Sequence, residues 1–286
     1  MKQKISLVAV AALSLILSAN SDAQTATSLF WRSDSLQVKE IVSQQAVQYN
    51  FVGHHGPAVE NSHCALRVYF NDSGAIDVYS KSGKQMELRE YLWYPSEKQQ
   101  AEGAGCDEYL VGRTVGVGGI ALWDGEKEVK LKATKGRTAR VGEIKGGKYA
   151  EMIAYGVEYK GELVDVSIRV EMRDNSRVAK VIATELNGKK VQFLTGINYQ
   201  KGETVEYGKK YIAVWGIHPA DVSKNPSPLG AGMWFKPGKF VTVEKTGDMV
   251  RIISKPAKSI STQVVAASTK EDELNTEAKF VSYMKK

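Results

Sequence analysis

The stretch "YAEMIAYGVEYKGELVDVSIRVEM", residues 149–172, alternates apolar and polar side chains on both sides of the turn residues 159–162 (YKGE). A period of two places every second side chain on the same face, which is typical of a β-strand buried on one side. The lysine and glycine between the two alternating runs favour a reversal of the chain. This stretch therefore predicts an antiparallel hairpin with one face in a core.

The same alternation recurs along most of the chain, interrupted by short turns rich in glycine, asparagine and aspartate. Helix signals are few, and we expect one short helix within residues 94–103 and a terminal helix within residues 270–286. The sequence thus predicts an all-β fold, an antiparallel β-sandwich of the supersandwich, mutarotase-like type with few short helices. The further segments expected to be strands are residues 65–70, 75–81, 109–123, 128–134, 177–186, 191–199, 210–217, 239–245 and 248–254.

The first 23 residues have the composition of an export signal. Lys2 and Lys4 precede an apolar run, residues 5–17, that is too short for a lasting membrane span, and small residues around Ala23 suit cleavage. We expect residues 24–286 to form a single domain that is exported to the periplasm. No later segment of the sequence is long and apolar enough to cross a bilayer, so no membrane partner is expected.

The chain is basic, with a formal charge of +7 and a pI of about 9.1. Cleavage after Ala23 removes two lysines and one aspartate, which lowers the formal charge by one. The positive charges are scattered and mostly close to acidic residues, which is typical of a solvated surface; the functional alternative is an acidic ligand such as a uronic acid or a sulfated glycan. No run of basic residues indicates nucleic acid as a partner.

The two cysteines, Cys64 and Cys106, leave two interpretations open. They form a disulfide in an oxidising compartment, or they are two separate buried thiols. Neither cysteine has a histidine or second cysteine at the spacing of a zinc site, so we expect no metal. Nothing in the sequence indicates an oligomeric state.

The stretch "HHGPAVENSHCALRVYFNDSGAIDVYSK", residues 54–81, holds three of the four histidines. Its turn residues 71–74 (NDSG) allow Phe70 to pair with Ile76, which makes Tyr69 the cross-strand neighbour of Asp77. A solvated strand face and a concave ligand-binding face are both compatible with this pattern. The polar residues that then share one face are His63, Arg67, Tyr69, Asp77, Tyr79 and Lys81.

The loop before this hairpin contains His54 and His55, followed by Gly56 and Pro57. Adjacent side chains of an extended chain point in different directions, so we expect at most one imidazole to face a site. Histidine is a general acid or base near neutral pH, and Glu60 could orient an imidazole or act itself. Further candidates are aromatic residues that stack on sugars or fill a core, and a histidine at the end of a strand: Tyr91, Trp93, Tyr94 and His218.

Residues 54–81 resemble the signature of a bacterial family, domain-of-unknown-function family 4861. A second block, residues 91–125, also resembles it, and the resemblance extends over about residues 51–286. Members accompany polysaccharide-degrading enzymes, and one relative is an oligosaccharide dehydratase of ulvan breakdown. The matching residues in the first block are His54, His55, Gly56, Glu60, Arg67, Tyr69, Phe70, Asp77, Tyr79 and Lys81.

The resemblance implies a periplasmic carbohydrate-active lyase, a dehydratase that eliminates water from uronic-acid-containing, ulvan- or pectin-like oligosaccharides. Such a reaction needs a cation to hold the carboxylate, a base to take a proton and an acid to protonate the leaving oxygen, and it requires no metal or cofactor. The candidate catalytic residues are His54, His55, Tyr69 and Tyr79. The candidate substrate-binding residues are Glu60, His63, Arg67, Asp77, Lys81, Tyr91, Trp93, Tyr94 and His218.

Two other functions fit the same residues. A non-catalytic glycan-binding protein would use the arginine and the aromatic side chains without turnover. A sugar epimerase or mutarotase-like protein would share the β-sandwich and change its substrate without loss of mass. Among the acid–base and cationic candidates we favour His55 and Arg67.

Overall fold

The computed structural model describes residues 25–44, 48–92, 94–220 and 223–286. The predicted export signal lies outside these residues, so the predicted cleavage near Ala23 stays a prediction. Within the described ranges, no helix has the length and apolar character needed to span a membrane.

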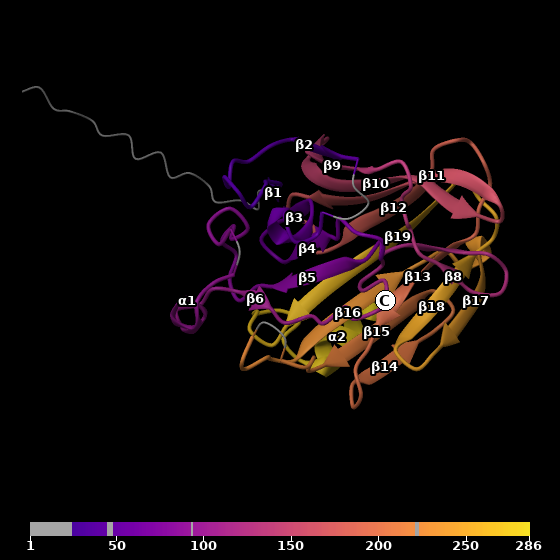
Figure 1. Cartoon of the computed structure of the whole chain (residues 1–286). Helices are drawn as coiled ribbons and strands as arrows, with labels where there is room; N and C mark the ends of the chain where they lie inside the picture. The colour runs from indigo at the N-terminus through magenta and orange to yellow at the C-terminus, as the bar shows by residue number, and fades with distance from the viewer. Residues whose placement is uncertain (1–24, 45–47, 93, 221–222) are drawn as a thin grey trace, which may run out of the picture.

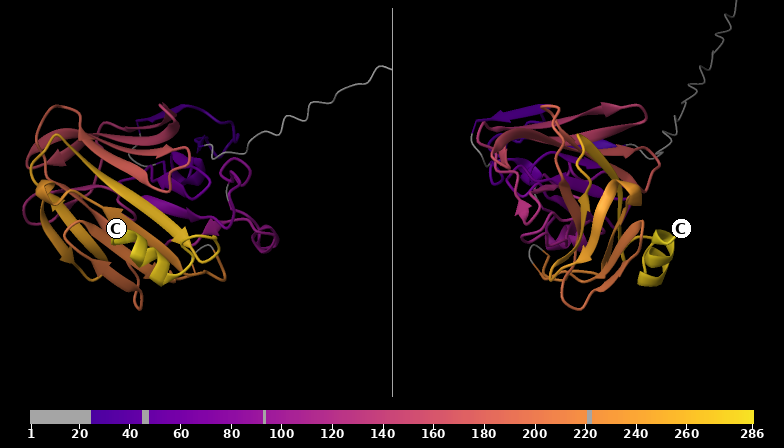
Figure 2. Two further views of the ribbon diagram at one scale, coloured as in Figure 1. Left: turned by 180° about the vertical axis from the view of Figure 1, so that it is seen from behind. Right: turned by 90° about the vertical axis from the view of Figure 1, so that its right-hand side faces the viewer.

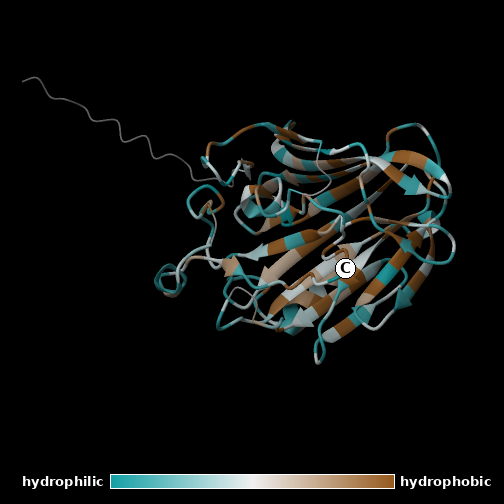
Figure 3. Ribbon diagram, in the orientation of Figure 1, coloured by the Kyte–Doolittle hydropathy of each residue, from teal (hydrophilic) through white to brown (hydrophobic). Residues whose placement is uncertain are grey.

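The largest element of the fold is a nine-stranded antiparallel sheet (Figure 1). The hairpin predicted from residues 149–172 lies in it, and its two strands pair from Tyr159 opposite Glu162 to Gly147 opposite Arg173. Alternating hydrophobic and hydrophilic bands along the strands reflect one face in the core and one outside (Figure 3). The strands, in spatial order, are β14 (Thr204–Tyr207), β15 (Tyr211–Gly216), β16 (Leu229–Trp234), β19 (Ser259–Ser268), β12 (Ala179–Glu185), β11 (Glu162–Arg173), β10 (Gly147–Tyr159), β9 (Arg137–Ile144) and β2 (Glu40–Ser43).

Two five-stranded sheets cover the inner face of the large sheet. The first packs on β10 and β11, and the second packs on β15 and β16, so the main core combines side chains from all three sheets. The predicted antiparallel β-sandwich is therefore confirmed. The first sheet contains β1 (Ala26–Ser28), β3 (Ala58–Glu60), β4 (Ala65–Val68), β5 (Ile76–Ser80) and β6 (Cys106–Asp107). The second contains β17 (Phe240–Lys245), β18 (Met249–Ser254), β13 (Phe193–Asn198), β7 (Ala121–Trp123) and β8 (Glu128–Val129).

Both predicted α-helices are present in the described chain. Helix α1 (Glu97–Ala101) begins with a capping box at Ser96, and α2 (Glu277–Met284) begins after Thr276, so the terminal helix is shorter than predicted. Two short 3₁₀ turns, η1 (Gly53–His55) and η2 (Pro237–Lys239), complete the helical segments. Helix α2 packs on β15 and β16 from the outer side of the large sheet (Figure 2).

Several strand predictions differ from the structure: besides β19, the strands β1, β2, β3, β6, β9, β14 and β16 were not predicted. Residues 109–120 form only isolated bridges, because Gly116 and Gly118 adopt positive φ angles that interrupt a strand. Strand β19 was not predicted, because residues 264–267 (VVAA) are apolar on both faces. The helix α2 explains this run, since Phe280 and Met284 cover its outer face.

The predicted register of the β4–β5 hairpin is wrong by two residues. Val68, not Phe70, lies opposite Ile76, and Arg67 lies opposite Asp77. The amide of Phe70 instead donates to the carbonyl of His55 at 2.8 Å, which takes Phe70 out of the hairpin. A shift of two leaves every side chain on the predicted face, so the polar residues still share one side.

Candidate functional site

The outer face of the first small sheet carries a layer of charged and polar side chains. We call this the polar layer and define it by residues from β3 to β6 and their flanks: Glu60, Arg67, Tyr69, Asp77, Tyr79, Lys81 and Asp107. Arg67 and Asp77 are 0% exposed, and the layer as a whole is buried except for the half-buried Tyr69. The hairpin face is therefore not the solvated surface that the sequence left open.

Arg67 lies between two carboxylates. It forms ion pairs with Asp77 and, at 2.6 Å, with Asp107. Tyr69 donates its hydroxyl to the same Oδ2 atom of Asp77 at 2.6 Å. Burial raises the pKa of Asp77, and Arg67 opposes the rise. The arrangement fixes Tyr69 by a short hydrogen bond to a carboxylate whose other partner is a buried guanidinium.

A second buried group occupies the other end of the layer. Lys81 contacts Glu60 at 3.3 Å and donates to the carbonyl of Asn61 at 2.8 Å. Glu60 also accepts the amides of Glu87 and Leu88, at 2.9 and 2.8 Å. These contacts tie the segment around residue 87 over the sheet. Glu60 therefore binds backbone amides and Lys81, and it forms no described hydrogen bond with either imidazole.

Tyr79 belongs to this second group. Its hydroxyl donates to Glu87 at 2.8 Å, and burial, together with the Glu87 charge, raises its pKa. The side chain is 2% exposed. Because its hydroxyl is separated from solvent, Tyr79 is a weaker candidate for the catalytic acid than the half-buried Tyr69.

The loop with the two histidines has a strained backbone. His54 and His55 adopt φ angles of 54° and 62°, in the left-handed region that residues other than glycine rarely occupy. Gly56 follows, and a Cβ on it would meet the carbonyl oxygen of Val68 at 2.0 Å. Strain of this kind costs of the order of 1–3 kcal/mol per residue and is concentrated at functional sites. The loop therefore holds the imidazoles in positions that the local backbone alone does not favour.

His55 is held as a neutral imidazole whose Nε2 acts as the hydrogen-bond acceptor. Its Nδ1 lies 3.1 Å from the carbonyl of Tyr49, which only accepts, so Nδ1 carries the proton. Nε2 then accepts from the hydroxyl of Tyr94 at 3.2 Å. Burial, with smaller contributions from the charges of Arg67 and Arg32, lowers the pKa of His55 to about 4.

Aromatic rings surround His55. Tyr49 stacks on the imidazole with 3.8 Å between ring centroids, and Tyr69 lies edge-on at 5.9 Å. Burial raises the pKa of Tyr94, so its hydroxyl is protonated at neutral pH. His55, Tyr94 and Tyr69 thus place one proton acceptor and two hydroxyls around a half-buried spot. We call these three residues the acid–base cluster.

His54 has a different environment. It is 2% exposed, its Nε2 donates to the carbonyl of Leu88 at 2.8 Å, and its ring lies edge-on to Phe30. Burial, with a smaller contribution from Arg67, lowers its pKa to about 3. Of the two histidines, only His55 has described contacts with Tyr94 and Tyr69, which agrees with the expectation that adjacent side chains point in different directions.

A hollow of about 660 Å³ lies along residues 31–33 and the residues that flank Tyr49, and none of the three acid–base cluster residues lines it. It is lined by residues that sequence reasoning missed: Trp31, Arg32, Ser33, Gln48, Asn50 and Phe51. Arg32 donates to the carbonyl of Asn50 at 3.2 Å, and Phe51 is 63% exposed. The sequence does show an aromatic residue and an arginine in these segments, which are common in ligand sites. No periodic pattern, however, connects them to the hairpin.

Of the remaining predicted residues, His63 and His218 have no described contact with the acid–base cluster. His63 is half-buried near Arg177, and burial lowers its pKa. His218 is buried, accepts the amide of Leu110 at 2.9 Å and lies 4.2 Å from the ring of Tyr109, so it does not form the rim of a cleft. Tyr91 is half-buried, and Trp93 lies outside the described residues.

The described part of the chain contains no candidate metal site and two free cysteines. No three His, Cys, Asp or Glu side chains there are close enough together to hold a metal ion. Cys64 and Cys106 are both free and buried, so the disulfide interpretation is wrong. Burial raises the thiol pKa values to about 11 and about 12.

Comparison with known proteins identifies the family. The sequence matches the family model of a domain of unknown function (DUF4861) over residues 14–286. The chain belongs to the DUF4861 family. No curated protein matches it. Among solved structures, it is similar to a 4-alpha-glucanotransferase from Thermococcus litoralis at 13% identity and a TM-score of 0.36, over 82% of this chain but only 40% of that one.

The DUF4861 protein thus combines three features around the residues of its own strained loop. They are a neutral imidazole, two tyrosine hydroxyls and, along the residues that flank Tyr49, a hollow with a cation and aromatic rings. Arg67 and Lys81 are buried in ion pairs, so neither cation is open to direct contact with a ligand. The polar layer holds one member of the acid–base cluster in place, because Asp77 accepts a hydrogen bond from the hydroxyl of Tyr69.

Proposed function

We propose that this DUF4861 protein is an exported, periplasmic carbohydrate-active lyase that eliminates water from uronic-acid-containing oligosaccharides. The observation that carries the proposal is the neutral His55 in its strained loop, where Nε2 accepts a hydrogen bond from the hydroxyl of Tyr94. A base that is unprotonated at neutral pH and a protonated hydroxyl in contact are the requirements of general acid–base catalysis.

The reaction can be written with the groups of this cluster. A uronic acid occupies the hollow with its carboxylate toward Arg32 and its sugar face on Trp31 or Phe51. Tyr94 takes the proton from the carbon next to the carboxylate as its own proton passes to His55. Tyr69 protonates the hydroxyl that leaves as water. The catalytic groups are then restored when His55 releases its proton to solvent and Tyr69 takes one up. The substrate loses one water and gains one double bond.

The acidity of the carbon next to a carboxylate is low, so the charge that develops there must be stabilised. In the proposed reaction Arg32 is the cation in this role. Burial is the main cause of the lowered pKa of His55, and the charge of Arg32 makes a small contribution in the same direction. Asp77 keeps Tyr69 oriented through the 2.6 Å hydrogen bond.

Mass spectrometry of uronic-acid oligosaccharides incubated with the mature protein tests the proposal. We expect a product lighter by one water, formed by the unchanged protein and not by His55→Gly. The glycine variant is the suitable control because glycine adopts φ near 62° without strain. Cleaved products would make the protein a different lyase or a hydrolase.

A glycan-binding function without turnover is the second candidate. The observation that favours it is that Arg67, Lys81 and Tyr79 already have buried partners inside the protein. In that case a broad panel of oligosaccharides would show binding and no change of mass. His55→Gly would then alter affinity only modestly, whereas loss of a catalytic acid–base group lowers a rate by about 10²–10⁴-fold.

A further inference from the structure

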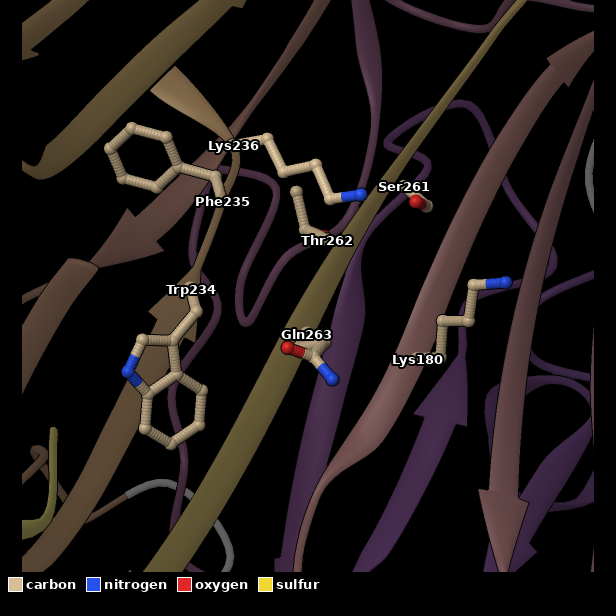
Figure 4. A pocket seen from close by; sticks show the side chains of 7 residues that line it. All are labelled: Lys180, Trp234, Phe235, Lys236, Ser261, Thr262 and Gln263. Atoms are coloured by element: carbon tan, nitrogen blue, oxygen red, sulfur yellow. The ribbon is translucent and has the colours of Figure 1, made fainter. Parts of the chain in front are cut away.

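A second hollow lies on the outer face of the nine-stranded sheet, on the side where α2 packs. Trp234 of β16 is the cross-strand neighbour of Gln263 in β19, and Gln263 is in turn the neighbour of Lys180 in β12. These three side chains form one row across three adjacent strands (Figure 4). The hollow has a volume of about 350 Å³ and is lined by Lys180, Trp234, Phe235, Lys236, Ser261, Thr262 and Gln263.

The indole of Trp234 is fixed in place. Its Nε1 donates to the carbonyl of Met284 at 2.9 Å, and its ring lies edge-on to Tyr283 at 5.6 Å. Helix α2 therefore anchors the ring from one side, and the ring remains only partly buried. A fixed, accessible aromatic ring is a preorganised platform for an apolar sugar face, because little side-chain entropy is lost on binding.

The other groups around the hollow are cationic or neutral. Lys180 and Lys236 are exposed, and neither ammonium group has an ion pair or hydrogen bond with any residue in the described part of the chain. Figure 4 shows Lys236 extending across β19 toward Ser261, while Gln263 lies beside the indole. The lining contains no carboxylate. Glu171 is the next residue of the row beyond Lys180 and forms no described ion pair with it.

We propose that this hollow is a second, non-catalytic binding site for an acidic oligosaccharide. One sugar ring lies on Trp234, the carboxylate or sulfate of the next lies between Lys180 and Lys236, and Gln263 and Ser261 bind hydroxyls. Two ammonium groups without carboxylate partners favour an anionic ligand over a neutral one. The excess of positive charge on the chain adds to the attraction.

The outer site is independent of the proposed reaction. It lies on the opposite face of the large sheet from the first small sheet, which carries His55 and the polar layer. A substrate polymer bound on the outer face would keep the enzyme on its source of oligosaccharides. The site would bind equally well if the acid–base cluster had no activity.

Hydrogen–deuterium exchange of the whole mature protein, with saturating tetragalacturonate or neutral cellotetraose, tests this site. We expect tetragalacturonate, and not cellotetraose, to protect peptides covering residues 229–236 and 259–268. The double variant Lys180→Gln/Lys236→Gln should weaken binding at this site at least tenfold. The matched control is Lys132→Gln/Lys201→Gln, which removes two exposed, unpaired charges outside the hollow.

The experiment is repeated with His55→Gly, so that the probe stays intact. Protection of both peptides in that variant, lost with Lys180→Gln/Lys236→Gln and kept in the control, supports the outer site even if no water loss is ever seen. Water loss without this protection overturns the outer site and leaves the proposed reaction standing. Equal binding of cellotetraose, or an equal effect of the control variant, also overturns it.

Discussion

Replacing Arg67 with methionine tests whether the polar layer is held together by one buried guanidinium. The substitution keeps a long apolar side chain but leaves Asp77 and Asp107 buried without their shared cation. Removing one member of a buried ion pair costs about 3–5 kcal/mol, because the remaining charge is neither solvated nor paired. Against a total stability of about 5–15 kcal/mol, this is a large fraction.

The cost should depend on pH with a defined sign. Burial already raises the pKa of Asp77 above its ordinary value of 3.8, and loss of Arg67 raises it further. A carboxyl with a raised pKa in the folded state contributes its full stability below its unfolded pKa and loses it as the pH rises through the folded pKa. Arg67→Met should therefore be more damaging at pH 8 than at pH 5.

Urea unfolding followed by circular dichroism at both pH values measures this. The matched control is Arg140→Met, which removes a half-exposed arginine paired with Glu40 and should cost no more than about 1 kcal/mol. The double variant Arg67→Met/Asp77→Asn removes one buried charge and should recover part of the loss. A cost of Arg67→Met below about 1 kcal/mol at pH 8, or a larger cost at pH 5, would refute the reasoning.

Three further predictions concern the strained loop and the thiols. His55→Gly should retain or gain stability, since glycine relieves the φ of 62°, while water loss falls by about 10²–10⁴-fold; a parallel fall in melting temperature would contradict this. Gly56→Ala should lower the free energy of unfolding by more than about 1 kcal/mol, because its Cβ meets Val68 O at 2.0 Å; unchanged urea unfolding would show that the loop adapts. Cys64 and Cys106 should react with a thiol reagent only after unfolding, whereas a protein without free thiols after denaturation would show a disulfide.

The fold class could be predicted from the sequence because it depends on local alternation. Residues 149–172 form the predicted hairpin with its turn at 159–162. Alternation does not predict a strand correctly where tertiary contacts decide which side chains are apolar or where the strand ends. The apolar run in β19 is explained only by α2, which packs on its outer face, and the glycines at 116 and 118 ended a strand that the flanking residues favoured.

The candidate site was predictable only in part. Parity along β4 and β5 placed Arg67, Tyr69 and Asp77 on one face, although the register was shifted by two residues. Parity does not show what covers a face, so the burial of that face could not be predicted. Arg32 and Tyr49 were missed, because no periodic pattern in their segments indicates contact with His55, although Tyr49 is only 6 positions away in the sequence.

The burial of the polar layer suggests why charged residues replace an ordinary core at this place. A buried ion pair adds little stability compared with apolar side chains of similar volume, so the Arg67–Asp77–Asp107 group is not explained by stability alone. It does hold Tyr69 at a fixed distance from a carboxylate, and the Glu60–Lys81 group holds the segment whose Leu88 carbonyl binds His54. One group therefore fixes Tyr69 near His55, and the other fixes the segment that binds His54. The energy spent on buried charge and on left-handed backbone is concentrated within a few residues of His55, which is where an acid–base reaction requires fixed geometry.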